Sequence, residues 1–84
     1  MRLSAGICEI DVHGMTKAQA VQLIDARLRQ AGPSVYRLRI IHGYHGGTGL
    51  RDEIRSRYRR HPKVLRLELG LNQGQTDLVL RELF

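Results

Sequence analysis

The chain has 84 residues, a length that fits one domain with a single hydrophobic core and leaves no room for a second domain. Its 14 Lys and Arg residues outnumber its 8 Asp and Glu residues, and all of the basic residues except Lys17 and Lys63 are arginine. Because arginine binds phosphate through a planar, bidentate fork, this composition and the net charge of +6 favour nucleic acid as a partner. The alternative is that the charge only keeps the protein soluble.

Cysteine content and hydropathy exclude several classes of protein. Cys8 is the only cysteine, which rules out an internal disulfide and a cysteine-based zinc site. No apolar run is long enough for a signal peptide or a bilayer span. We therefore expect a cytoplasmic protein that does not associate with membranes.

The first predicted strand covers residues 7–13 and follows a frayed end at residues 1–6. Its side chains alternate in polarity, which places the apolar residues on one face: Cys8, Ile10 and Val12. The alternation predicts a strand with one buried face.

The first helix lies between two local signals. Thr16 followed by Gln19 is a capping-box pattern, so the helix is expected to begin near Lys17. Gly32 and Pro33 end it, with the glycine expected in a left-handed C-cap. Its buried stripe consists of residues at helical spacing: Ala20, Val21, Ile24 and Leu28.

The second half of the chain repeats this alternation of strand and helix. A strand is predicted over 35–41, followed by a glycine-rich loop at 42–49 and a helix that ends at His61-Pro62. That helix has an apolar face and a separate column of arginines at i, i+4 spacing: Leu50, Ile54 and Tyr58, against Arg51, Arg55 and Arg59. A third strand over 64–69 is expected to turn three leucines inward: Leu65, Leu67 and Leu69. A fourth strand covers 76–83, where a helix at 78–80 is the alternative.

The predicted order βαβαββ describes an α/β fold of the two-layer α+β sandwich type. Crossovers through the helices make the first three strands parallel, and the short last connection lets the fourth strand run antiparallel. Because the strands alternate instead of being continuously apolar, both helices are expected to cover one face. The open face would display polar side chains: Glu9, Asp11, Arg37, Arg39, Arg66 and Glu68.

Two His-Gly pairs occupy matching positions in this pattern. His13-Gly14 and His42-Gly43 each follow an apolar strand and precede a helix. The carboxyl ends of parallel strands form the edge at which open α/β sheets bind ligands, so both imidazoles are expected at one edge. There, two histidines can share the roles of general base and general acid at a phosphodiester. The alternative is that each histidine only hydrogen-bonds a loop carbonyl.

Asp11 lies two residues before His13, so both side chains are expected on the same face. It can orient an imidazole or bind a divalent cation; alternatively it is an exposed carboxylate paired with Arg37 or Arg39. The histidines and the cysteine show no zinc-type spacing, and no dedicated metal site is predicted. A Mg²⁺ shared between Asp11 and a substrate phosphate stays open as a cofactor. Asp11, His13 and His42 are the predicted catalytic residues.

The glycine-rich loop has the character of an anion cradle. Glycine allows a close backbone approach, and the N-terminus of the next helix offers free N–H groups. The loop is not a Walker A loop, because the Gly-Lys-Ser/Thr ending is absent. A plain connector and a solvated helix face are the alternatives. The predicted nucleic-acid contacts are Gly43, Tyr44, His45, Gly46, Gly47, Thr48, Arg51, Arg55, Arg37 and Arg39.

These motifs, in this order, resemble the Smr (small MutS-related) domain family. Residues 10–14 are similar to its Leu-Asp-Leu-His-Gly motif, and residues 41–51 are similar to its His-Gly-x-Gly-Thr-Gly loop and the Leu-Arg that follows. Residues 72–76 are similar to the family's Asn-Pro-Gly turn. The resemblance covers residues 8–83, although the loop is longer than the common motif and carries Tyr44-His45 where a single residue, often lysine, is usual.

The resemblance implies a mixed four-stranded sheet in the order 1-2-4-3, related to the C-terminal domain of translation initiation factor 3. It also implies nucleic-acid binding and, in several members, an endonuclease that nicks DNA or cleaves RNA. On the matching positions, Asp11 and His13 would be catalytic, and His42, the glycine loop and Arg51 would contact the phosphate backbone. We therefore expect residues 1–84 to form one Smr-like domain with endonuclease activity.

Three alternatives to an endonuclease stay open. The first is a non-catalytic module that binds RNA, the ribosome or DNA, and the second is a protein-interaction domain whose charge is incidental. A sulfur carrier, the third, needs an exposed cysteine, whereas Cys8 falls on the buried face. Because the sequence predicts no further domain, other proteins are also considered as partners that recruit this one to its substrate.

Overall fold

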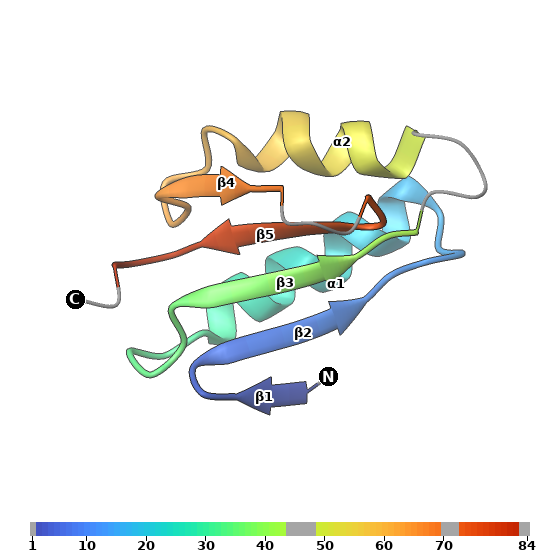
Figure 1. Cartoon of the computed structure of the whole chain (residues 1–84). Coiled ribbons are helices and arrows are strands. Elements are labelled where there is room, and N and C mark those ends of the chain that lie inside the picture. Colours follow the sequence, from blue (N-terminus) through green and yellow to red (C-terminus); the bar gives the residue numbers. More distant parts are fainter. Residues whose placement is uncertain (1, 44–48, 70–72, 83–84) are drawn as a thin grey trace.

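A computed structural model describes residues 2–43, 49–69 and 73–82 of the protein (Figure 1). Within these residues, five strands form one sheet in the order β1-β2-β3-β5-β4, accompanied by two helices. Their bounds are β1 (Arg2–Ser4), β2 (Ile7–Asp11), α1 (Lys17–Gln30), β3 (Arg37–Ile41), α2 (Gly49–Tyr58), β4 (Arg66–Glu68) and β5 (Gln75–Val79).

The sheet topology confirms the predicted order of the four main strands. β2 and β3 pair in parallel, whereas β5 runs antiparallel to both of its neighbours, β3 and β4. The last strand in sequence therefore lies between the second and third predicted strands. Residues 78–79 belong to β5, so the helix considered for residues 78–80 is wrong.

The predicted frayed end at residues 1–6 is wrong, because residues 2–4 form β1. β1 pairs antiparallel with β2, with Leu3 opposite Cys8. Ala5 (φ 52°) and Gly6 (φ 83°) join the two strands, and two consecutive positive φ angles are typical of a type I′ hairpin. Alanine rarely adopts a positive φ, and turns of this type usually have Asn, Asp or Gly at the first position. Only Gly6 therefore indicates the turn in the sequence.

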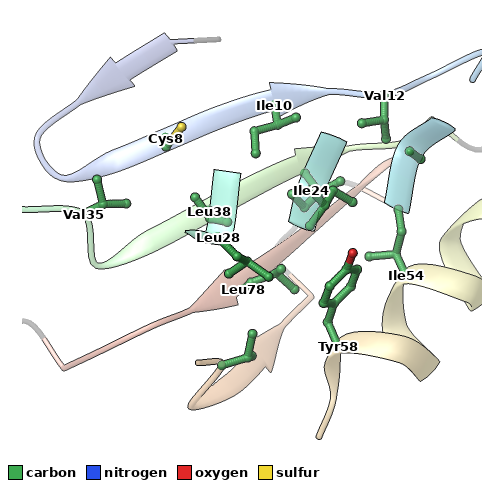
Figure 2. Close-up of a cluster of buried hydrophobic side chains, with 13 residues drawn as sticks. Cys8, Ile10, Val12, Ile24, Leu28, Val35, Leu38, Ile54, Tyr58 and Leu78 are labelled. Atoms are coloured by element: carbon green, nitrogen blue, oxygen red, sulfur yellow. The ribbon is translucent and has the colours of Figure 1, made fainter. Parts of the chain in front are cut away.

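Both helices cover the same face of the sheet, as predicted. Figure 2 shows side chains of α1 and α2 packed over the inward side chains of the strands. The buried cluster comprises Cys8, Ile10, Val12, Ala20, Ile24, Leu28, Val35, Leu38, Ile40, Ile54, Tyr58, Val64 and Leu78. The alternation of β2 predicted its core residues correctly, and so did the helical stripe of α1 except at Val21, which is only partly buried.

Tyr58 anchors α2 on α1. Its ring is fully buried, and its hydroxyl donates to Oδ1 of Asp25 at 2.7 Å and lies 3.3 Å from the carbonyl oxygen of Val21. A buried phenol needs such a partner, because an unsatisfied hydroxyl is costly in a protein interior. These contacts join the end of α2 to the middle of α1.

The ends of α1 agree with the predictions at one end only. Thr16 and Gln19 form the complete capping box. At the other end the C-cap is Ala31, whose backbone is extended (φ −66°), and Gly32 has no positive φ. The predicted left-handed glycine cap is therefore wrong, and the chain leaves α1 through an extended residue ahead of Pro33.

β4 departs from its prediction in length and in burial. Leu67 lies opposite Leu78 and packs against the core, but Leu65 and Leu69 are 55% and 52% exposed. β4 has only three residues at the sheet edge, so the two outer leucines fall beyond its ladder. Their predicted inward orientation is wrong.

Candidate active site at the carboxyl edge of the sheet

The two His-Gly pairs lie side by side at one edge of the sheet. β2 and β3 end together there, near the starts of both helices (Figure 1). The backbone N–H of Val12 donates to the carbonyl oxygen of Ile41 at 2.9 Å, so the pairing continues beyond β2. A Cβ built on Gly43 would lie 3.5 Å from Cβ of His13. Parallel strands therefore bring the two motifs together as the sequence predicted.

Gly43 turns the chain at this point. Its φ of +74° lies in the left-handed region, which a residue with a side chain rarely adopts. The backbone N–H groups of His42 and Gly43 both donate to the carbonyl oxygen of Gly74, at 2.9 and 3.0 Å. The start of the loop is thus held against the turn that leads into β5.

Asp11 and His13 form an exposed pair on this edge. Oδ1 of Asp11 accepts hydrogen bonds from the backbone N–H of His13 at 3.1 Å and from its ring Nδ1. The hydrogen bonds from the His13 side chain and backbone lower the pKa of the Asp11 carboxyl, which favours the carboxylate. The His13 and Asp11 side chains are 70% and 54% exposed. With Nδ1 donating to Asp11, Nε2 of His13 is left as the proton acceptor that faces solvent.

The alternative in which Asp11 pairs with Arg37 or Arg39 is wrong. Both guanidinium groups bind Asp77 on the open face of the sheet, Arg37 at 2.7 Å and Arg39 at 3.5 Å. Arg37 also binds Glu68 at 2.6 Å. These two predicted nucleic-acid contacts are therefore already engaged with carboxylates of the protein.

His42 occupies a different environment from His13. It is only 5% exposed, and both of its ring nitrogens have protein partners. Nδ1 lies 2.8 Å from the carbonyl oxygen of Gly43, and Nε2 lies 2.9 Å from Oγ1 of Thr76. For His42 the structure matches the alternative, a histidine bonded to a loop carbonyl, and in this arrangement neither ring nitrogen faces a substrate.

The burial of His42 makes the stability of the domain depend on pH. Burial lowers the pKa of His42 below 6.5, the bond to Gly43 opposes this, and the charges of Arg55 and Arg51 lower it further. The unfolded chain therefore takes up the proton more readily than the folded one. Stability from this group is fully present above pH 6.5 and is lost as the pH falls below that value.

Urea unfolding between about pH 7.5 and 5 tests this prediction. The free energy of unfolding is expected to fall with pH more steeply in the wild type than in His42→Gln, in which residue 42 no longer titrates while the other three histidines are kept. Equal slopes in the two proteins would contradict the assignment.

The cations of α2 flank the edge. Arg51 donates through Nε to Asp52 at 3.2 Å, and Arg55 donates through Nε to Thr76 at 2.9 Å. In the part of the chain that the structure describes, the exposed side chains of Arg59 and Arg60 have no ion-pair partner. A polar cavity of about 510 Å³ lies along this helix, lined by Asp52, Arg55, Ser56, Arg59 and Arg60. Three arginine side chains therefore line one cavity beside α2.

Sequence reasoning assigned no role to four residues of this region. Lys17 lies against the start of α2, with Nζ 3.8 Å from a Cβ built on Gly49. Arg60 lines the cavity, and the buried Thr76 and Asp77 bind the arginines. The sequence did contain a signal for Thr76. Residues 76 and 78 lie on the same face of a strand, so the polar Thr76 shares its face with the core residue Leu78. A polar residue on a buried face is informative, because such residues are usually exposed.

Much of the predicted loop lies outside the described residues, namely Tyr44, His45, Gly46, Gly47 and Thr48. Among the residues that are described, no group of three or more His, Cys, Asp and Glu side chains is arranged to hold a metal ion. A Mg²⁺ at this edge would therefore depend on Asp11 together with phosphate oxygens of a substrate. No described helix is long and apolar enough to cross a membrane.

Comparisons with known proteins agree with this arrangement. The family model of the Smr domain matches residues 10–77, which include both His-Gly pairs and the start of β5. No curated protein matches the chain significantly. Among solved structures, the chain is similar to the Smr domain of Thermus thermophilus MutS2, with a TM-score of 0.80 and 31% sequence identity. That match covers 89% of this chain and 99% of the other. The chain therefore belongs to the Smr domain family.

Proposed function

We propose that this Smr domain binds nucleic acid and cuts a phosphodiester bond, as an endonuclease that nicks DNA or cleaves RNA. The observation that carries the proposal is the exposed Asp11–His13 pair at the carboxyl edge of the sheet, beside an arginine-rich helix. His13 Nε2 accepts the proton of the attacking hydroxyl, which belongs to water or to a ribose 2′-OH. Asp11 orients the imidazole and stabilises the imidazolium that forms.

Substrate binding in this proposal depends on α2. Arg51, Arg55 and Arg59 follow one another at i, i+4 spacing, which is about 6 Å along the helix axis. The column leads away from the catalytic edge, because α2 begins there (Figure 1). A nucleic-acid strand bound along α2 would therefore place one of its phosphates next to His13. The nearby cations also favour the charge that develops on the phosphate during cleavage.

A non-catalytic binding module is the second candidate, and the environment of His42 favours it. Two proton transfers are needed to break a phosphodiester, yet only His13 of the two predicted histidines presents a free ring nitrogen. In an endonuclease the leaving oxygen would then take its proton from water or from another group.

A cleavage assay on matched DNA and RNA substrates separates the two candidates. Purified protein is expected to cut at least one of them, and reactions with and without Mg²⁺ test whether a cation at Asp11 contributes. Salt-sensitive binding with no cleavage in any reaction would reject the endonuclease in favour of the binding module.

The unpaired arginines that directly follow α2, Arg59 and Arg60, predict a change in the salt dependence of binding. If Arg59 and Arg60 each contact one phosphate, binding of duplex DNA by the double variant Arg59→Ala/Arg60→Ala should depend less on salt. The negative slope of log K against log salt should become shallower by about 2. Fluorescence anisotropy over a range of salt concentrations measures this slope.

The control is Arg29→Ala/Arg57→Ala, which removes the same charge. Arg29 lies in the last turn of α1, and Arg57 pairs with Glu53 at 3.2 Å. Equal slopes for the two double variants would show that binding responds to net charge and not to this cavity.

A further inference from the structure

We infer that Thr76 and Arg55 are positioning residues that connect the phosphate-binding side of α2 to the loop beside His13. The inference rests on the proposed function and extends it to residues that do not themselves take or give the reacting proton. It starts from the hydroxyl of Thr76, which is fully buried yet shared by two side chains. His42 Nε2 and Arg55 Nε both lie 2.9 Å from Oγ1 of Thr76.

Elementary hydrogen-bond chemistry fixes the direction of each bond. The carbonyl oxygen of Gly43 can only accept, so Nδ1 of His42 carries a proton and donates to it. In neutral His42, Nε2 is then an acceptor, and the hydroxyl of Thr76 donates to it. Arg55 Nε can only donate, and it fills an acceptor position of the same hydroxyl oxygen. The bonds therefore run in one direction, from Arg55 through Thr76 and His42 to Gly43.

One end of this chain of bonds reaches the catalytic edge. Gly43 accepts the last bond, and a Cβ at Gly43 would meet Cβ of His13 at 3.5 Å. The hydroxyl of Thr76 thus sets the tautomer and the ring orientation of His42, and His42 holds the carbonyl of Gly43. Any change in this arrangement moves the backbone that packs against His13.

The other end reaches the arginine side of α2. Arg55 uses Nε for Thr76 and also lines the cavity that it shares with Arg59 and Arg60. A guanidinium group presents donors in a rigid fork, so the terminal nitrogens of Arg55 can bind a phosphate while Nε stays bonded inward. A phosphate held in this way fixes Arg55, and through it Thr76 and His42.

Three variants separate this role from simple packing. Thr76→Val keeps the shape of the side chain but removes the hydroxyl, which leaves His42 Nε2 without its donor. Thr76→Ser keeps the hydroxyl and is the rescue variant. Arg55→Lys keeps the positive charge but loses the fork, so it cannot serve the hydroxyl and a phosphate together.

Long-range ¹H–¹⁵N NMR of the histidine rings tests the bonds without any substrate. The wild type is expected to show neutral His42 with its proton on Nδ1 near neutral pH, and Thr76→Ser is expected to look the same. In Thr76→Val the Nε2 signal should shift, and the titration of His42 should change. Arg59→Lys is the matched control in the same arginine column, and its His42 signals should stay at the wild-type positions. A proton on Nε2 of His42 in the wild type, or unchanged His42 signals in Thr76→Val, would overturn the inference.

Cleavage kinetics then test the coupling. Thr76→Val and Arg55→Lys should lower kcat by about 10- to 100-fold, whereas Thr76→Ser should retain most of the wild-type kcat. A kcat that is unchanged in Thr76→Val, or lowered equally in Thr76→Ser, would reject a positioning role for the hydroxyl. If the wild type cleaves nothing although its His42 signals are as expected, the proposed function fails. The connection is then judged by whether a bound oligonucleotide shifts the His42 signals in the wild type but not in Arg55→Lys.

Discussion

Replacing His13 with alanine is expected to lower the rate of phosphodiester cleavage by about 10²- to 10⁴-fold, the usual contribution of a general base. The variant should fold normally, because the His13 side chain is 70% exposed and lies outside the buried cluster. Asp11→Asn should also lower the rate, since an amide stabilises an imidazolium less well than a carboxylate does. Initial rates on the preferred substrate, together with thermal unfolding of each variant, measure the two effects.

His61→Ala is the matched control for this experiment. His61 follows the end of α2, away from the catalytic edge, and its Nδ1 accepts a hydrogen bond from the backbone N–H of Lys63 at 3.1 Å. The same substitution there should leave cleavage close to the wild-type rate. If cleavage by His13→Ala equals that of the wild type, the activity belongs to another site or to a contaminant, and the proposed catalytic pair is wrong.

Replacing Arg37 with methionine is expected to destabilise the domain by about 3–5 kcal/mol. Arg37 neutralises Asp77, which is only 2% exposed, and it binds Glu68 as well. Without it, Asp77 keeps Arg39 at 3.5 Å as its remaining ion-pair partner. A loss of this size is a large fraction of the stability of a small domain, so urea unfolding should show a markedly lower midpoint.

Two further variants complete this test. The double variant Arg37→Met/Asp77→Leu removes both charges and should recover most of the lost stability. Arg59→Met removes an exposed arginine and should change stability by no more than about 0.5 kcal/mol. If Arg37→Met is as stable as the wild type but binds nucleic acid more weakly, Arg37 is a nucleic-acid contact, as its position on the open face first indicated.

The parts of the fold that the sequence predicted correctly are those governed by local patterns. Thr16 and Gln19 are close enough in sequence to mark the start of α1, and the alternation of β2 identifies its buried face. The sequence did not predict β1. Its pairing with β2 depends on a tight turn at Ala5-Gly6, and alanine adopts an uncommon backbone conformation there. Leu65 is exposed because β4 is shorter than predicted. The alternation of apolar and polar residues predicts which face a residue is on, but it does not predict where the strand ends.

The candidate site divides in the same way. The neighbourhood of His13 and Gly43 follows from two parallel strands that end together, which the order of elements already implied. The burial of His42 does not follow from that order, because it depends on Thr76, a residue 34 positions away. Likewise, Arg37 and Asp77 are 40 positions apart in the sequence. The pairing of Arg37 with a carboxylate on the open face could therefore be seen only in the structure.

The Asp11–His13 contact and the His42–Thr76 bond therefore differ in how they form during folding. Asp11 and His13 are separated by a single residue, so their contact closes a very short loop and needs little of the native topology. The bond between His42 and Thr76 requires β5 to have inserted between β3 and β4. Partly folded molecules should thus form the Asp11–His13 contact early and the Thr76 bonds to His42 and Arg55 late, so the proposed cleavage would require the fully assembled sheet.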